Sequence, residues 1–294
     1  MSEIAGQTSQ PQWSKVLWKS QPYPDDYVPS EIFLASLQRN ANFKPYTYWP
    51  LVTLSCSITQ HISVIFIFLA VFGLLDTQLL DSRTLICISV ACFVVGYALW
   101  TILDNTSQPI GNHVKAIKSS IMIFLFLISL SPVLRTLSAA TSSDSIWALA
   151  AVLFLLNTLL SDYTATNVTG ELRGRLTSVL AMNAAISASV VLASRLDSDI
   201  SVFALTLFAV EVFILYPMLK PRVQELSEPL WMLTTVVLST LALYFLSQLS
   251  RMVAVLCFAT LTFITFVAPV LLVWAQKYKN NIKGPWDVAT PKVR

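Results

Sequence analysis

The sequence of 294 residues is poor in the residues that build soluble catalytic and nucleotide-binding sites. Only 12% of its residues are charged, and its seven glycines form neither a phosphate-binding loop nor the GxGxxG turn that holds a dinucleotide. Its two histidines, His61 and His113, lie far apart in the sequence and match no zinc-binding spacing. We therefore expect no metal ion and no cofactor in this chain.

Cysteine is also scarce, and the four cysteines form no CxxC pair. All four fall inside apolar segments, which favours small packing residues over metal ligands or disulfides: Cys56, Cys87, Cys92 and Cys257. The N-terminal segment before the first apolar run is polar and lacks the apolar core of a cleavable signal peptide. We expect the first apolar run to act as its own targeting signal.

Long apolar runs, in contrast, dominate the sequence. Hydrophobic residues make up 55% of the chain and the mean hydropathy is +0.66, values typical of a protein with several membrane spans. Eight runs approach or reach the roughly 20 residues that cross a bilayer core as a helix; they are 49–75, 84–103, 117–137, 145–160, 176–196, 200–219, 229–249 and 252–275. Because backbone groups in lipid must bond within their own segment, the sequence predicts an all-α, polytopic membrane bundle of about eight transmembrane helices.

The basic residues predict an orientation for this bundle. Fifteen of the nineteen lysines and arginines lie before the first run, after the eighth, or in or beside every second gap between runs. The remaining gaps hold only Arg83, Arg135, Arg195 and Arg251. Because cytoplasmic loops carry the excess of lysine and arginine, we expect both termini in the cytoplasm. The predicted organisation is a cytoplasmic N-terminal segment (1–48), a transmembrane bundle (49–275) and a cytoplasmic C-terminal segment (276–294).

Several polar side chains lie inside the runs, where each is costly unless it faces protein or water. They are Thr53, Ser57, Gln60 and His61 in the first run, Asn157 in the fourth with Ser161 directly after it, Asn183 in the fifth and Glu211 in the sixth. These residues either line a hydrophilic cavity or bond neighbouring helices to one another.

The fifth run has a face of small residues at four-residue spacing, Ala181, Ala185, Ser189 and Ala193. Such a face lets neighbouring backbones approach closely. We expect this run to be the central helix of the bundle.

One short motif has the form of a metal-binding site. Asp197-Ser198-Asp199 matches the DxD pattern that holds a divalent ion in many transferases. Here it lies in a very short gap on the predicted non-cytoplasmic side, beside Arg195. The alternative, a solvated turn that caps the next helix, is the interpretation we favour.

Short motifs at both ends of the chain and within it resemble one known family. They are WSKVLW at 13–18, QPYPDDYV at 21–28, SPVLRTL at 131–137, DY at 162–163, PML at 217–219 and NIKGPWD at 281–287, with further matches within 183–196. In order and spacing they resemble the PIG-C family, the C component of the phosphatidylinositol N-acetylglucosaminyltransferase complex. The resemblance covers nearly the whole chain, from Trp13 to Asp287.

The resemblance implies a multi-pass protein of the endoplasmic reticulum membrane. Its complex transfers N-acetylglucosamine (GlcNAc) from UDP-GlcNAc to phosphatidylinositol, the first step of glycosylphosphatidylinositol (GPI) anchor synthesis. In the family the transfer is assigned to another component, the catalytic subunit, so this chain resembles a subunit that is not an enzyme on its own. The six glutamates agree, because none lie eight positions apart as a retaining transferase of that kind requires. The implied partners are the other subunits, including the catalytic one, phosphatidylinositol and membrane lipids, with no nucleic acid.

Within this interpretation three sets of residues are candidates. Candidates for binding the lipid headgroup, at the expected cytoplasmic ends of the spans, are Asp162, Tyr163, Asn167, Lys220 and Arg222. Candidates for an intramembrane polar role are His61, Asn183 and Glu211. Candidates for partner docking are Trp13, Lys15, Pro22, Asp25, Tyr27, Pro285 and Trp286. Helix capping, bonding between helices and ordinary topology charges are the alternative roles for the headgroup set.

Two other functions stay open from the sequence. A lipid transporter or scramblase would pass a headgroup through a polar cavity at Gln60, His61, Asn183 and Glu211, although the sequence has no inverted repeat or matching pair of broken spans. A membrane-embedded transferase would need an acid–base constellation that the sequence lacks. The first hypothesis is a scaffold that presents phosphatidylinositol to the catalytic subunit.

Overall fold

The computed structural model describes residues 16, 20–24, 27, 37–38, 45–103, 110–136, 142–163, 172–280 and 290–291. The chain divides into two compact units, one formed by Met1–Tyr46 with Val273–Arg294 and the other by Thr47–Leu272. In the first unit, strands β1 (Leu37–Gln38) and β2 (Thr290–Pro291) pair antiparallel. The side chain of Gln276 accepts a hydrogen bond from the Tyr46 backbone nitrogen at 2.8 Å and donates one to the Tyr46 carbonyl at 2.9 Å. The two ends of the chain are therefore joined within this unit.

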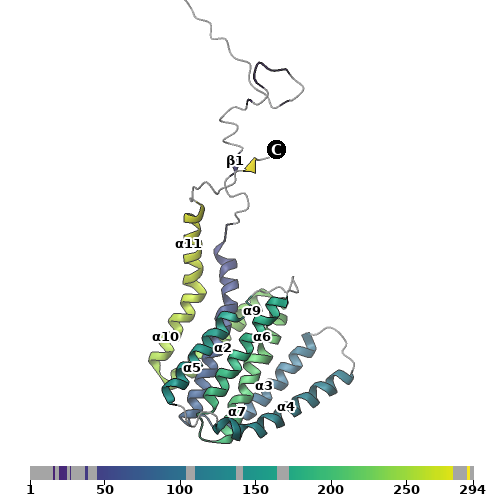
Figure 1. Cartoon of the computed structure of the whole chain (residues 1–294), viewed down its shortest axis with the longest axis vertical. Coiled ribbons are helices and arrows are strands. Elements are labelled where there is room, and N and C mark those ends of the chain that lie inside the picture. The colour runs from purple at the N-terminus through teal and green to yellow at the C-terminus, as the bar shows by residue number, and fades with distance from the viewer. Residues whose placement is uncertain are drawn as a thin grey trace, which may run out of the picture. The chain divides into compact units, whose positions relative to one another are not determined.

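The rest of the described chain is helical, as the sequence predicts (Figure 1). The single helices are α2 (Tyr48–Asp76), α3 (Ser82–Leu103), α4 (Ile110–Thr136), α5 (Ser143–Leu160), α6 (Leu172–Ala193) and α9 (Glu228–Leu249). Two longer helices each contain a π-helical turn: α7 (Asp199–Val210), η1 (Glu211–Leu215) and α8 (Tyr216–Leu226) are continuous, as are α10 (Arg251–Thr262), η2 (Phe263–Val267) and α11 (Ala268–Asn280).

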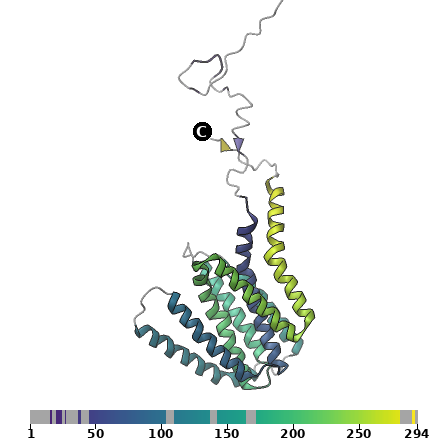
Figure 2. The ribbon, with the colours of Figure 1, turned by 180° about the vertical axis from the view of Figure 1, so that it is seen from behind.

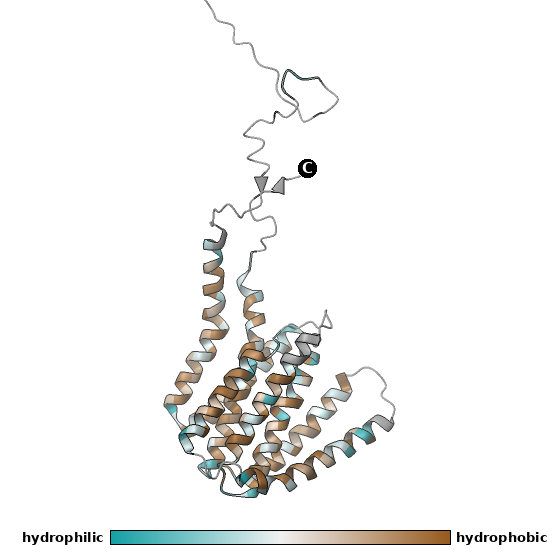
Figure 3. Cartoon of the chain, viewed as in Figure 1, coloured by the Kyte–Doolittle hydropathy of each residue, from teal (hydrophilic) through white to brown (hydrophobic). Residues whose placement is uncertain are grey.

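Seven helices of the described chain are long and apolar enough to cross a membrane. They are Tyr48–Asp76, Ser82–Leu103, His113–Thr136, Ser143–Leu160, Asp199–Leu226, Glu228–Leu249 and Arg251–Gln276. Each coincides with a run identified in the sequence. The remaining run is the shorter apolar helix Ser178–Ala193. Apolar side chains dominate these helices along most of their length (Figure 3), so the structure confirms a predominantly helical chain with several helices of membrane-spanning length.

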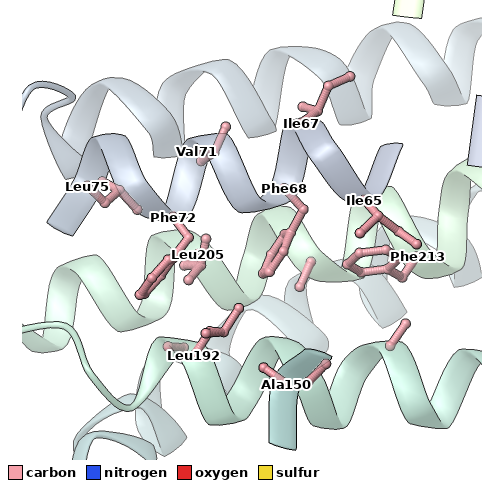
Figure 4. Close-up of a cluster of buried hydrophobic side chains, with 14 of the residues drawn as sticks. Ile65, Ile67, Phe68, Val71, Phe72, Leu75, Ala150, Leu192, Leu205 and Phe213 are labelled. Atoms are coloured by element: carbon pink, nitrogen blue, oxygen red, sulfur yellow. The ribbon is translucent and has the colours of Figure 1, made fainter. Parts of the chain in front are cut away.

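The core of the second unit forms around α2. This helix packs against α5, α7, α9, α10 and η2, and α9 lies along it on the face seen from behind (Figure 2). Phe68 is fully buried, with its ring centroid 5.2 Å from that of Phe213 and 5.8 Å from that of Phe154. Figure 4 shows Phe68 facing residues of α7 and η1. These aromatic contacts tie α2 to α5 and to the α7–η1–α8 helix.

The small face of the fifth run is buried, but α6 is not the central helix. Ala185, Ala188, Leu192 and Ala193 are fully enclosed and pack α6 against α5 and α7. Among the residues whose burial the structure describes, α2 has the larger buried share, so the expected central position of the fifth run is wrong. Small side chains on one face allow a neighbouring helix to pack closely, but they do not determine how many helices surround it. The central position belongs to α2 because other helices surround it.

Local irregularities in the helices coincide with contacts between them. Within the π-helical turn η2, the Thr265 carbonyl accepts a hydrogen bond from the Ser55 hydroxyl of α2 at 3.2 Å. The Thr59 and Thr265 hydroxyls lie 2.8 Å apart. At the other end of α2, a Cβ atom on Gly73 would lie 3.0 Å from Leu249 of α9, so glycine permits that close approach.

Candidate functional site

A group of polar and aromatic side chains gathers where α2, α5, α8 and α9 meet. We call it the Lys220 cluster, and it consists of His61, Asn157, Ser161, Tyr163, Lys220 and Trp231. His61 comes from α2, Lys220 from α8 and Trp231 from the first turn of α9, while the other three lie at the end of α5 or just after it. Three of the sequence-based candidates, His61, Tyr163 and Lys220, are therefore brought together.

His61 and Asn157 form the inner side of the cluster. His61 Nε2 donates to Asn157 Oδ1 at 2.8 Å, and the hydroxyl of Ser161 is 3.3 Å from the same nitrogen. Asn157 Nδ2 donates to the carbonyl of Ala181 on α6 at 2.8 Å. Asn157 is buried, and its amide connects α2, α5 and α6 through these bonds.

Lys220 lies on the other side of the cluster. Its ammonium donates to the Ser57 carbonyl at 3.0 Å and lies 5.8 Å from the ring centroid of Tyr163 and 5.6 Å from that of Trp231. Both distances fall in the range of cation–π attraction. Among the described residues, no carboxylate forms an ion pair with it. An ammonium has three donors, and a phosphate oxygen is a suitable partner for those left over.

Tyr163 and Asp162 close the cluster after the end of α5. The Tyr163 hydroxyl donates to the Thr158 carbonyl at 2.7 Å, and its ring meets that of His61 edge-on at 5.7 Å. Burial raises the pKa of Tyr163 to about 12, so its hydroxyl remains a neutral donor at physiological pH. Asp162 is exposed. The Asp162 carboxylate and the Tyr163 phenol oxygen can both accept hydrogen bonds from inositol hydroxyls, since the Tyr163 proton is already donated to Thr158.

Gln60 shows that part of the polar stripe on α2 serves to join helices. It is fully buried, and its Nε2 atom donates to the Trp231 carbonyl at 3.3 Å and to the hydroxyls of Thr234 and Thr235 at 3.1 and 2.9 Å. The Tyr216 hydroxyl donates to Gln60 Oε1 at 3.0 Å. Of the two roles open from the sequence, bonding between helices is the one that Gln60 performs.

Glu211 lies at a separate place, where it lines a cavity of about 590 Å³ within the second unit. Its lining comes from α2, α3, α4, α9 and the α7–η1–α8 helix, and among the lining residues Glu211 is the one carboxylate. Arg222 stacks its guanidinium over the ring of Trp100, another lining residue, at 5.6 Å. Lys220 and Arg222 are only two positions apart in the sequence, yet their side chains lie at different sites.

Other candidates are not part of either site. Asn183 is exposed on α6, and Gln60, His61 and Asn183 do not line the cavity that holds Glu211. Pro22 and Tyr27 are exposed in the first unit, where the rings of Tyr23 and Tyr27 stack at 4.5 Å. Six candidates lie outside the described residues: Trp13, Lys15, Asp25, Asn167, Pro285 and Trp286.

The DxD motif has the capping role that the sequence favoured. Ser198 is the N-cap of α7, and its side chain accepts a hydrogen bond from the Ser201 backbone nitrogen at 3.0 Å. Asp199 pairs with Arg135 of α4 at 3.1 Å, and Arg135 also donates to the Asp197 carbonyl at 3.2 Å. The described residues contain no group of three or more side chains able to hold a metal ion.

Sequence reasoning missed Trp231 and Trp100 as site residues. Each lies near a helix end and supplies a ring face to a basic residue of α8. Tryptophan near a predicted span end is normally assigned to the bilayer interface. The signal that could have identified these tryptophans as site residues was the presence of a lysine or arginine at the end of another span, with which such a ring can pair.

Together, the helices and the polar sites between them define a polytopic membrane protein of the all-α class. Comparison with known proteins identifies the family within that class. The family model described as GPI2, phosphatidylinositol N-acetylglucosaminyltransferase, matches residues 13–287. The chain therefore belongs to this family, which confirms the resemblance to PIG-C.

Curated relatives match over nearly the full chain. The phosphatidylinositol N-acetylglucosaminyltransferase GPI2 subunit of Schizosaccharomyces pombe is 39% identical, with 96% of this chain and 87% of the relative covered. The putative C component of the same enzyme from Dictyostelium discoideum is 37% identical, with 95% and 79% covered. The C component of the same enzyme from Homo sapiens is 32% identical, with 97% and 95% covered. No solved structure matches this chain.

Proposed function

We propose that this chain is a non-catalytic membrane subunit of the enzyme that transfers GlcNAc from UDP-GlcNAc to phosphatidylinositol in GPI-anchor synthesis. The observation that carries the proposal is the family match over residues 13–287, with relatives named as subunits of that enzyme. The glutamate spacing supports the non-catalytic part, because the chain lacks the pair that a retaining transferase uses. Catalysis is then supplied by a separate catalytic subunit of the same complex.

The second part of the proposal is that the chain presents phosphatidylinositol to the catalytic subunit. The Lys220 cluster supports this role because it combines a cation, which forms no ion pair with a described carboxylate, with the hydroxyl of Tyr163, and the exposed carboxylate of Asp162 directly precedes Tyr163 in the sequence. An ammonium suits the phosphodiester, and the other two groups suit the inositol hydroxyls. Asn167, outside the described residues, is proposed as a further ligand.

The topology and location are part of the same proposal. We place eight helices in the endoplasmic reticulum membrane, with both termini and the Lys220 cluster on the cytoplasmic side, because the basic residues gather there. Segments 1–48 and 276–294 flank the bundle and contain the motifs at 13–28 and 281–287. We assign these motifs, including Trp13, Lys15, Pro22, Asp25, Tyr27, Pro285 and Trp286, to docking of other subunits.

Affinity purification tests the assignment to the complex. The full chain with a tag is isolated in mild detergent, and the eluate is assayed for GlcNAc transfer from UDP-GlcNAc to phosphatidylinositol while mass spectrometry identifies the proteins present. We expect the activity and a glycosyltransferase subunit to co-purify. The assignment is lost if the chain elutes alone and without transferase activity when it is expressed with all of its natural partners.

The transporter alternative has no support in the geometry of the described residues. Its proposed path required Gln60, His61, Asn183 and Glu211 to line one cavity. Gln60 is instead fully buried in bonds between helices, Asn183 is exposed, and Glu211 lines a cavity that the other three do not. The lipid-presenting role is therefore the one we carry forward.

A further inference from the structure

We propose that the cavity beside Glu211 is a second lipid site, which takes one acyl chain of an anionic glycerophospholipid and holds the lipid phosphate at Arg222. This site is separate from the Lys220 cluster and does not depend on the proposed function. Its volume of about 590 Å³ lies well within the range of about 300–1,000 Å³ that ligand pockets occupy. A space of that size accommodates far more than a single water molecule.

The lining of the cavity suits a hydrocarbon chain. It includes Val64 and Ile67 of α2, Phe93 of α3, Phe208 of α7 and Leu238 of α9. All five lie in helices long and apolar enough to cross a membrane. Water gains few hydrogen bonds on such a surface, whereas a lipid chain from the surrounding bilayer fills it with favourable van der Waals contacts.

Gly96 shows that open space extends to the surface of α3. This glycine lines the cavity, and a Cβ atom placed on it would meet no atom within 4 Å. Its neighbours on the same wall, Phe93 and Tyr97, stack their rings at 6.3 Å. A larger side chain at Gly96 would therefore enter the cavity without displacing the backbone around it.

Positive charge lies at one end of the cavity. Trp100 lines the cavity there and lies close to Leu103, the last residue of α3. The exposed Arg222 guanidinium lies over the Trp100 ring. Lys115 and Lys118 are exposed on α4, on either side of the lining residue Ala116. No carboxylate of the described chain forms an ion pair with these three residues. Arginine and lysine at headgroup level attract anionic phospholipids, and a guanidinium binds phosphate oxygens in pairs.

Glu211 marks the deeper part of the cavity. It begins the π-helical turn η1, eleven residues before Arg222, which corresponds to about 16 Å along a helix. The buried Ser89 hydroxyl of α3 lies near the Glu211 carboxyl, and Ser89 does not line the cavity. A π-helical turn at such a point is common beside ligand sites. The separation matches a phosphate at the Arg222 end and a hydrocarbon chain extending toward η1.

Photo-crosslinking of lipids to the full chain in its complex tests the site. The probes are phosphatidylinositol, phosphatidylserine and phosphatidylcholine that carry the same photoactivatable acyl chain, incorporated into nanodiscs. We expect both anionic probes to label peptides from residues 92–100 and 211–219 more strongly than phosphatidylcholine does. Preference for phosphatidylinositol would identify the substrate lipid as the occupant, and equal labelling by the two anionic probes would identify anionic lipids in general. Labelling of these peptides that does not exceed labelling of exposed positions on the same helices would overturn the proposal.

Two variants with a matched control separate the chain site from the headgroup site. Gly96→Leu fills the cavity and should reduce labelling about tenfold, the change that 1.4 kcal/mol in affinity produces. Ala98→Leu makes a similar change on an exposed face of α3 outside the cavity and should leave labelling unchanged. Arg222→Gln should reduce the preference for anionic probes, to which Lys115 and Lys118 also contribute. Unchanged labelling in Gly96→Leu, with an unaltered melting temperature, would contradict the acyl-chain site. An undiminished anionic preference in Arg222→Gln would contradict the phosphate site.

Discussion

At the scale of single residues, polar groups inside the bundle have different roles that depend on what surrounds them. Gln60 has all its described bonds to other helices and is fully buried. Lys220, with one described bond and two ring contacts, has donors left for a ligand. The sequence singled out Gln60 as a polar residue inside an apolar run and Lys220 as a basic residue at the end of one, and the three-dimensional partners assign each its role.

Replacing Gln60 should therefore reduce stability rather than activity. Gln60→Leu leaves the half-buried Tyr216 hydroxyl without its acceptor, and we expect a loss of about 1–2 kcal/mol in the free energy of unfolding. The measurement is the melting temperature of the purified chain in detergent. The control is Thr240→Val, because the exposed Thr240 hydroxyl bonds only the carbonyls of its own helix. Equal melting temperatures for Gln60→Leu and wild type would show that these bonds do not hold the helices together.

Lys220 should determine the affinity for the lipid substrate. Lys220→Met removes a charge-assisted contact to phosphate, and we expect the KM for phosphatidylinositol to rise about tenfold or more while the KM for UDP-GlcNAc stays unchanged. Lys220→Arg should retain most of the affinity, and Arg251→Gln, at the opposite end of the bundle, should have no effect. An equal rise in both KM values, or loss of the assembled complex, would instead mark Lys220 as a structural residue.

At the scale of helices, apolar runs and charges predicted most of the fold. The expected runs overlap the observed helices because length and hydropathy alone require a helix in lipid. The π-helical turns η1 and η2 were not predictable, since they depend on partners from other helices, such as Ser55 against the Thr265 carbonyl. The separation of Lys220 from Arg222 follows from helix geometry, because two residues along a helix point to nearly opposite sides.

The start of α7 provides a test at this scale. Ser198→Ala removes the N-cap bond to Ser201 and should cost about 0.5–2 kcal/mol of stability. Asp197→Ala should cost less, because its described contact is made by the backbone carbonyl, which the substitution retains. Both variants should keep their transferase activity in the complex, with the same dependence on divalent cations as the wild type. If Asp197→Ala alone abolished activity in a cation-dependent manner, the motif would be a metal site after all.

At the scale of the whole molecule, the up-and-down course of the helices places the basic residues in two groups, one at each end of the bundle. Lys115, Lys118, Lys220 and Arg222 lie at the ends of helices that meet on one side of the bundle, whereas Arg83, Arg135, Arg195 and Arg251 flank the turns at the other side (Figure 1). This arrangement supports the proposed orientation, with the Lys220 cluster and the Arg222 end of the cavity toward the cytoplasm.

Glycosylation reports this orientation directly. The two Asn-X-Ser/Thr sequences at Asn105 and Asn167 both lie in gaps that we place in the cytoplasm, so neither should acquire glycan. An acceptor sequence introduced between α9 and α10, near Ser250, with a spacer long enough to reach the glycosylating enzyme, should be modified. Mobility on gels before and after glycosidase treatment shows whether the natural and the introduced acceptor sequences carry glycan. Glycan on Asn105 or Asn167 would reverse the orientation of the molecule.

The central claim, a non-catalytic subunit that presents phosphatidylinositol, is tested most directly by reconstituted transfer. Labelled GlcNAc transfer from UDP-GlcNAc to phosphatidylinositol is measured in vesicles that contain this chain alone, the other subunits alone, or both. We predict product only when both are present, with a rate that falls in Lys220→Met and is restored by raising the concentration of phosphatidylinositol. Product from this chain alone, or full activity from the other subunits without it, would contradict the account.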